Sequence, residues 1–488
     1  MNFLELIPGI SYTDRVDDLQ DAAKDSVRNI QKRVMRYHVD SKTYRDEIAD
    51  KEELASERGP RISDGECAWG QYLTDSHQNH GVGTYGTSAA VRILGLNGYS
   101  SEVTDVDADR EEIESMGQQW LRSQWKEGSP TWKDQKQAVV YRCIAFQRSL
   151  ARPTCSRFSV ECPCHHLWNK GTVVDDRMQW YEYAYDDGST DTEPRDLSTA
   201  YALYGLQGCS HLVEDEDERG TYHEALCDLA DELLDAEEDD VYTKRRIVEL
   251  SICLLALTDH RGRLSAGEDV PDSHRGYGFP HPAEKKTETD ERISGIAKQI
   301  GHIMRTEGPL VDTYYIRLFS TPKPRLRDCY YPFAVGPVAA LALLRAGKRV
   351  GPAVHGRNLP YLNEVVETYA EEFGLSEQGK GHFSSDERGA ASIGDHAWVA
   401  EALDAYADID PDEIPDRSIA RGKASTYNLI GVVLVALVVA LVVAIGWLSY
   451  SFGGTSSFVQ TMLLVLLLTL LSAFTGPQLL GDRIRRNL

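Results

Sequence analysis

The feature that most constrains this chain is an Ala- and Leu-rich helical segment that recurs along most of its length. Its clearest copy, residues 327–345, reads RDCYYPFAVGPVAALALLR, with an acid and two tyrosines ahead of an apolar helical face. Similar segments lie roughly 50 to 80 residues apart, a spacing typical of repeats built from helical hairpins. The six segments begin near Cys67, Lys133, Arg195, Thr243, Arg327 and Gly394. They predict about six helical hairpins, each contributing one inner helix.

Acidic amphipathic stretches lie between these segments and suit an outer layer of helices; examples are Tyr222 to Asp239 and Tyr361 to Phe373. Many repeated segments open with a small or acidic residue, as a helix N-cap does. They then run Ala-rich, which lets neighbouring helices approach closely. Because no long alternating run is bounded by hairpin turns, the sequence predicts an all-α fold.

The N-terminal stretch Tyr12 to Glu57 is charged and has a helical period. Its apolar residues form one stripe: Val16, Leu19, Ala22, Ala23, Val27, Ile30 and Val34. A free coiled-coil arm would need heptads that persist, and these do not. We therefore expect this helix to lie against the main domain.

Two apolar runs without a charged side chain close the chain, Leu429 to Tyr450 and Phe458 to Leu480. Each is long enough to span a hydrocarbon core of about 30 Å. The link SFGGTSS is short and uncharged, so the two spans should form an antiparallel hairpin. Basic residues flank the hairpin on both outer sides: Arg417, Arg421, Lys423, Arg483, Arg485 and Arg486. The positive-inside rule then predicts a cell-membrane protein whose two termini and soluble domain are cytoplasmic.

Neither predicted span carries an ionisable residue, so we expect an anchor, or the assembling part of a homo-oligomer, rather than an ion pathway. The chain divides into an amphipathic segment, a repeat domain, a basic linker, a transmembrane hairpin and a basic tail. The predicted boundaries are 1–57, 58–410, 411–427, 428–482 and 483–488.

The acidic composition excludes one class of partner. The 76 Asp and Glu residues against 52 Lys and Arg residues give a formal net charge of −24. Nucleic-acid binding needs a basic footprint, so we expect no nucleic-acid partner. The acid is spread through nearly all soluble segments, which suits a halophilic cytoplasm whose salt screens the self-repulsion.

The cysteines indicate a reducing compartment. Nine cysteines with irregular spacing do not form a disulfide framework. Cys143, Cys227 and Cys253 stand in apolar helical runs, where a buried thiol behaves as a small hydrophobe. The start MNFLELIPGI lacks the features of a cleavable signal peptide.

Between Cys67 and Asp408 the repeats resemble the α/α-toroid superfamily, which includes terpenoid cyclases and protein prenyltransferase β subunits. The resemblance rests on the Tyr- and Ala-rich inner helices and on the Gly-aromatic turns at Gly83–Gly86 and Gly276–Phe279. It implies an α/α toroid of about six helical hairpins, followed by the two transmembrane helices. An open helical solenoid would give similar periodicity. One fold hosts many functions, so the resemblance alone gives no activity.

The same resemblance points to a zinc site at Asp328, Cys329 and His396. In prenyltransferase β subunits an Asp and a Cys at the head of one inner helix and a His at the head of a later one hold a catalytic zinc ion. Three such ligands leave a fourth position for a substrate thiolate. Here the acid and the thiol are adjacent, so their directions on a helix differ by about 100°. Alternatively, Asp328 caps a helix, Cys329 packs in the core and His396 makes a local hydrogen bond.

A second candidate zinc site lies in TCSRFSVECPCHHLW. Its thiols and imidazoles would make a structural zinc knot; they are Cys155, Cys162, Cys164, His165 and His166. The spacing fits no familiar finger, so a Cys-rich connector is the alternative.

Other motifs give weaker indications of function. The acidic run at Asp105, Asp107 and Asp109 is the nearest match to the proton-donating motif of class II terpenoid cyclases, and we expect it in an exposed connector. The aromatic run Trp180 to Tyr185 either lines a cavity or packs between hairpins. No spacing selects a catalytic pair of acids, and phosphate-loop, nucleophile-elbow and H-E-x-x-H motifs are absent from the sequence.

Two functions of different class follow. The first is a membrane-anchored scaffold, sensor or effector that binds a protein partner or a small ligand in its cavity or on its concave face. The second is an enzyme like a terpenoid cyclase or prenyltransferase, acting on a lipidic isoprenoid substrate with or without zinc. The missing acid motif and the imperfect zinc triad favour the first.

Overall fold

The computed structural model of this protein describes its helical domain. The described residues are 12–44, 62–70, 73, 82–97, 105–124, 167–181, 196–207, 212, 215–236, 243–265, 282–307, 313–317, 330–351, 353–374 and 393–410. They contain eleven helices and little sheet, which confirms the predicted helical class. The helices are α1 (Tyr12–Arg36), α2 (Ser41–Thr43), α3 (Thr84–Leu94), α4 (Asp105–Gln124), α8 (Asp196–Gly205), α10 (Glu216–Asp235), α11 (Thr243–Ser265), α12 (Pro282–Glu307), α13 (Val335–Val350), α14 (Ala353–Gly374) and α15 (Ile393–Ala407).

Three short antiparallel ladders accompany these helices. They pair β1 (Val39–Asp40) with β2 (Cys67–Ala68), β3 (Thr172–Val174) with β4 (Arg177–Gln179), and β5 (Thr313–Arg317) with β6 (Tyr330–Ala334). Each ladder has two strands. The described sheet therefore adds local turns and braces to a helical core.

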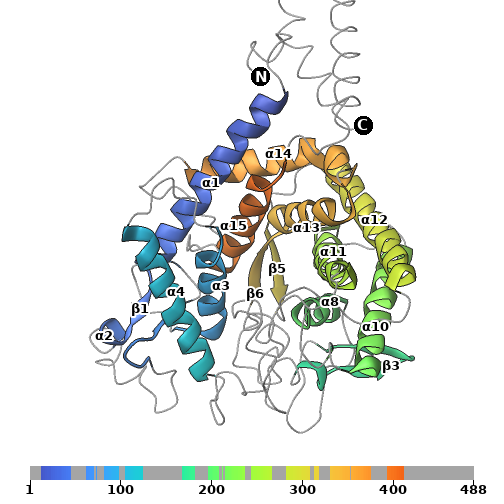
Figure 1. Ribbon diagram of the computed structural model, residues 1–488, viewed down its shortest axis with the longest axis horizontal. Coiled ribbons are helices and arrows are strands. Elements are labelled where there is room, and N and C mark those ends of the chain that lie inside the picture. The colour runs from blue at the N-terminus through green and yellow to red at the C-terminus, as the bar shows by residue number, and fades with distance from the viewer. Residues whose placement is uncertain are drawn as a thin grey trace, which may run out of the picture.

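The helices form two curved layers (Figure 1). An inner arc runs through α3, α15, α13, α11 and α8, in which each helix contacts the next. Outside it lie α4, α1, α14, α12 and α10, and each of these packs on an inner helix. The β5–β6 hairpin hangs inside the arc, beside α15.

Burial separates the two layers. All residues from Leu197 to Gly205 in α8 are buried, and twelve residues each of α13 and α15 are buried as well. Small side chains such as Ala339 and Ala400 have no exposed surface, and they let the inner helices approach closely. The outer helices are amphipathic; α10, for example, buries Leu226 and Leu233 and exposes Glu224. The core therefore lies between the layers and along the whole inner arc.

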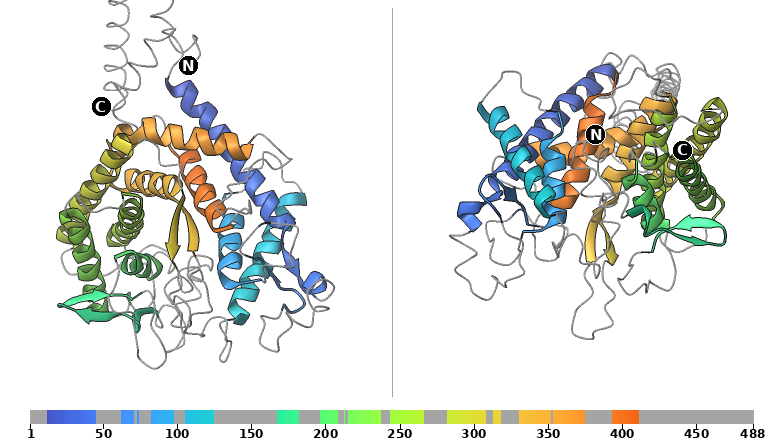
Figure 2. Two further views of the ribbon diagram at one scale, coloured as in Figure 1. Left: turned by 180° about the vertical axis from the view of Figure 1, so that it is seen from behind. Right: turned by 60° about the horizontal axis from the view of Figure 1, so that its bottom comes forward.

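The N-terminal helix packs where we expected it. Of the predicted stripe, Val16, Leu19, Ala23, Val27, Ile30 and Val34 are buried. Helix α1 contacts α14 and α15, so the first helix of the chain covers the last inner helix (Figure 2). The buried Gln20 amide donates from Nε2 to the backbone oxygens of Ile409 (2.7 Å) and Tyr406 (3.3 Å). These bonds hold the end of the helical domain against α1.

Three local predictions were wrong. The helix starting at Tyr12 ends at Arg36, short of the expected Glu57, and a turn and β1 follow. The repeated segment at Cys67 was expected to begin as a helix, but Cys67 and Ala68 form the strand β2. The acidic run from Asp105 begins helix α4 and is not a connector, although Asp109 is exposed as expected; early acids suit a helix N-terminus, and a stripe from Ile113 to Leu121 packs inward.

The central repeated segment also differs from its prediction. Residues Tyr330 to Ala334 form the strand β6, and the helix α13 begins only at Val335. Three aromatic residues favour a strand here, and Pro332 biases the residue before it toward extended backbone. Pro337 is tolerated because it lies in the first turn of α13, where an N–H has no helical partner.

Several predicted elements fall outside the described residues. They are the segment from Lys133, the turn Gly276–Phe279, the juxtamembrane linker and both C-terminal apolar runs. Among the helices that the structure does describe, none combines the length and the apolar character needed to cross a membrane.

Candidate functional site

Polar side chains line up at one level across the buried inner helices. Near the start of both helices, a Cβ placed on Gly394 of α15 would meet the Tyr85 hydroxyl of α3. Seven residues further along each helix, Arg92 of α3 contacts Glu401 of α15. The two contacts make these neighbouring inner helices parallel, so the same depth in each helix meets across the interface.

Four residues form what we call the polar belt: Arg92, Tyr204, Arg345 and Glu401. Glu401 accepts from Arg92 Nη2 through one carboxylate oxygen and from Arg345 Nη2 through the other, at 3.2 Å. Arg345 Nη1 also lies 3.1 Å from the Tyr204 hydroxyl. The belt thereby ties α3, α15, α13 and α8 together inside the arc.

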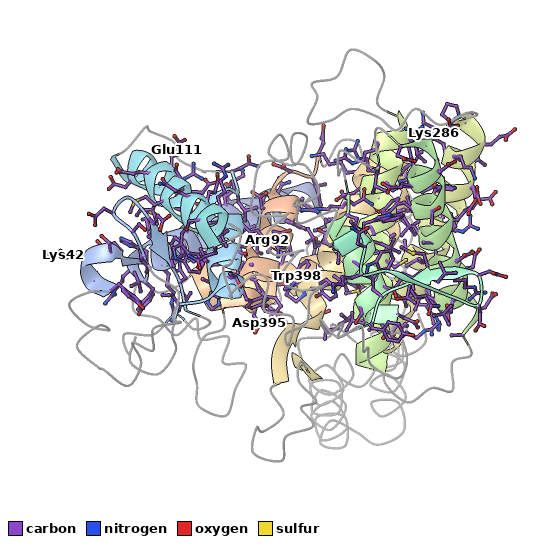
Figure 3. All side chains as sticks on the ribbon, turned by 90° about the horizontal axis from the view of Figure 1, so that it is seen from below. Lys42, Arg92, Glu111, Lys286, Asp395 and Trp398 are labelled. Atoms are coloured by element: carbon purple, nitrogen blue, oxygen red, sulfur yellow. The ribbon has the colours of Figure 1, made fainter. Side chains whose placement is uncertain are left out.

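The electrostatics of the belt are largely self-contained. The Glu401 side chain is 5% exposed and is held as a carboxylate between two guanidinium groups. Burial opposes the charge on Arg345, but Tyr204, Glu401 and Asp259 outweigh it and raise its pKa above the ordinary value. Arg92 places its Cζ 4.7 Å from the centre of the Trp398 ring, a cation–π contact. Figure 3 shows Arg92, Trp398 and Asp395 together near the middle of the molecule.

His396, a predicted zinc ligand, is fully buried in the first turn of α15. Its neighbour Asp395 is also buried, in the first turn of the same helix. The other two predicted ligands, Asp328 and Cys329, lie outside the described residues, just before β6. Since α13 begins six residues after Cys329, the head of this inner helix is Val335.

The remaining sequence candidates divide between packing and the undescribed chain. Trp180 is fully buried, donates from Nε1 to the Leu167 carbonyl oxygen at 2.8 Å, and packs 6.2 Å from the Trp168 ring. It therefore packs between elements, while the rest of its aromatic run from residue 182 lies outside the described residues. The second candidate zinc site also lies outside the described residues; its members are Cys155, Cys162, Cys164, His165 and His166.

Sequence reasoning missed one group of metal-ligating side chains. His223 and Cys227 of α10 and Glu288 of α12 place one ligand atom each within 4.8 Å of one another. Cys227 is buried as predicted, but it packs beside a histidine and a carboxylate and not only among apolar groups. The four-residue spacing of His223 and Cys227 on one helix is a signal that the sequence does carry. Nothing in the sequence around Glu288 indicates that it belongs to this group.

Comparisons with known proteins assign no family to this chain. The chain matches no protein-family model, and comparisons with curated proteins and with solved structures return no significant match.

Proposed function

We propose that this protein is a membrane-anchored helical scaffold that binds a protein partner and does not turn over a substrate. In this proposal the helical domain is an α/α toroid or a closely related curved repeat. Two spans between residues 428 and 482 anchor it, with the domain and both termini on the cytoplasmic side. The hairpin of spans also allows assembly into a homo-oligomer.

The polar belt is the observation that carries the proposal. Both oxygens of Glu401 bind guanidinium groups, so this acid is poorly suited to donate a proton. A general acid or base must change its protonation during the reaction, and a carboxylate between two cations resists that change. The described inner arc thus contains a buried ion-pair network that joins four helices, which suits a rigid frame.

The curved two-layer arrangement supports the toroid part of the proposal. Inner and outer helices alternate along the chain in the order α3, α4, then α8, α10, then α11, α12, then α13, α14. Helix α1 supplies the outer partner of α15. The last described residues are bound to α1 through Gln20, so the chain leaves the domain beside its own N-terminal helix. A domain fixed at that end leaves its other surfaces available to a partner.

The experiment uses the full-length chain extracted from its own membranes in a mild detergent and in molar KCl. We expect native mass spectrometry to find a complex larger than the monomer. We also expect allylic prenyl diphosphates and linear isoprenoids to be left unconverted. The matched variants are His396→Ala, in the inner layer, and His302→Ala, on an exposed site of α12.

Conversion of an isoprenoid that is lost in His396→Ala and kept in His302→Ala would overturn the scaffold and establish the enzyme. A protein that is released from membranes by salt alone would overturn the anchor.

A further inference from the structure

The missed cluster lies in the outer layer, away from the polar belt. His223 and Cys227 are four residues apart on α10, so their side chains share one face of the helix. Glu288 reaches them from α12, the outer helix of the next hairpin. The inner helix α11 lies against both, and its His260 completes the surroundings.

The distances within the cluster fit a metal ion. Cys227 Sγ lies 3.7 Å and Glu288 Oε2 3.5 Å from His223 Nε2. A tetrahedral zinc ion with its usual bond lengths holds a sulfur and a nitrogen about 3.6 Å apart, and a nitrogen and an oxygen about 3.3 Å apart. Two of the three distances between the ligand atoms therefore match those of a zinc tetrahedron, and the third, between the Cys227 sulfur and the Glu288 carboxylate, is no longer than 4.8 Å.

Neighbouring groups aim two of the three ligand atoms. His260 Nε2 lies 2.8 Å from His223 Nδ1, which leaves Nε2 of His223 directed at the cluster. Arg292 Nη1 lies 3.1 Å from Oε1 of Glu288, so that Oε2 faces the cluster, where it also pairs with Lys285 Nζ at 3.6 Å and would exchange this pair for the metal ion. Such outer partners are the usual means of orienting histidine and carboxylate ligands.

Charge and protonation are compatible with a divalent ion. Arg292 is itself paired with Asp231 through two bonds, at 2.9 and 2.7 Å, and Lys285 Nζ lies 3.6 Å from Glu288. Burial lowers the pKa of His223 to about 4, so its imidazole is neutral and able to bind a metal. Burial raises the pKa of the Cys227 thiol to about 12, so this group is protonated until a metal displaces the proton.

We propose that His223, Cys227 and Glu288 form a binding site for a zinc-class divalent metal ion. On binding, the Cys227 S–H bond breaks, its proton goes to solvent, and a metal–thiolate bond forms. Nitrogen, thiolate and carboxylate ligands together suit zinc better than calcium or magnesium. The His223 side chain is 2% exposed and that of Glu288 is 39% exposed, so the carboxylate ligand lies on the solvent side of the site.

This site joins two consecutive hairpins. A metal ion held by α10 and α12 ties the outer helices to each other, while His260 links the site to α11. Metal binding is therefore coupled to the packing of this part of the domain. The site is independent of the polar belt and of the scaffold proposal.

The first test reads the reactivity of individual thiols in the unmodified full-length chain. Pulsed alkylation in mild urea, analysed peptide by peptide, measures how often each buried cysteine opens. At free zinc ten times the dissociation constant, Cys227 should react about tenfold more slowly, because the ion must leave first. Cys67, buried on β2 beside α3 and α4, is the matched control and should react at the same rate with and without zinc. An unchanged rate at Cys227 would overturn the proposal, even if zinc binds elsewhere on the chain.

The second test uses variants and cobalt as a coloured substitute for zinc. Cys227→Ser should remove one equivalent of metal and the matching share of the cobalt–thiolate charge-transfer band, and Cys253→Ser should keep both. His260→Gln should weaken cobalt binding roughly 10- to 100-fold, since His260 positions His223 without touching the ion. Full metal content in Cys227→Ser would show that the ion sits at another place.

Discussion

Replacing Glu401 by Gln tests the polar belt most directly. The change keeps the shape of the side chain and removes the charge that pairs with both Arg92 and Arg345. Removing one partner of a buried ion pair costs about 3–5 kcal/mol, because the remaining charge is left buried. Here the Arg92 side chain is 12% exposed and that of Arg345 is 29% exposed, so water recovers part of the loss. We therefore expect Glu401→Gln to lower the local stability by about 3 kcal/mol.

The assay is native-state hydrogen exchange in helix α15, in the full-length chain in detergent. A chain of this size does not unfold in one step, so the opening free energy of one helix is better defined than a single global value. The loss should persist in molar KCl, since salt screens buried pairs much less than surface pairs. Trp398, which packs beneath Arg92, gives a second local signal through its fluorescence.

The matched control is Glu224→Gln, an exposed site on α10. A surface substitution of this kind should change stability by no more than about 0.5 kcal/mol. A loss in Glu401→Gln as small as that of the control would mean that the belt contributes little to packing. It would also remove the main support for the scaffold proposal.

Four further substitutions test the fold. Gly86→Ala should lower the stability by about 3 kcal/mol in thermal unfolding, because a Cβ there would clash with the backbone that follows β2. A Cβ at Gly220, which lies in a helix, meets open space, so Gly220→Ala should raise the stability by up to about 1 kcal/mol. Gln20→Leu removes the donor for two backbone oxygens at the end of α15. It should cost about 1–3 kcal/mol and speed up hydrogen exchange at that end. Unchanged exchange would contradict the conclusion that α1 holds this end of the domain. Asp215→Ala removes the N-cap of α10, whose carboxylate accepts from two backbone N–H groups at 3.0 Å. The loss of this cap should cost about 1 kcal/mol in urea unfolding. An unchanged unfolding midpoint would show that the cap is dispensable.

Helices with a periodic apolar stripe were predictable from the sequence. All residues of the α1 stripe except the half-buried Ala22 are buried, because one buried face repeats every 3.6 residues. The inner segments from Arg195, Thr243 and Gly394 also form helices close to their predicted starts. In each case the evidence lies within one stretch of chain.

Contacts between distant stretches were not predictable in this way. Helices α8 and α15 are buried all round, so their sequences have no polar face to indicate which neighbour lies where. The strand β6 replaced a predicted helical start because its pairing with β5 depends on residues 13 or more positions away in the chain. The metal-type cluster was missed for the same reason, since Glu288 comes from a different helix than His223 and Cys227.

One signal of long-range contact does survive in an apolar inner helix, and it is the isolated charge. Arg92, Arg345 and Glu401 each interrupt a run of buried residues. A buried charge without an opposite partner is too costly to keep, so each of these residues implies another inner helix that supplies the partner. Two cations and one anion of this kind then predict a shared contact, which the belt provides. Among helices buried all round, exceptions to the apolar pattern therefore locate a shared interior level better than the pattern itself.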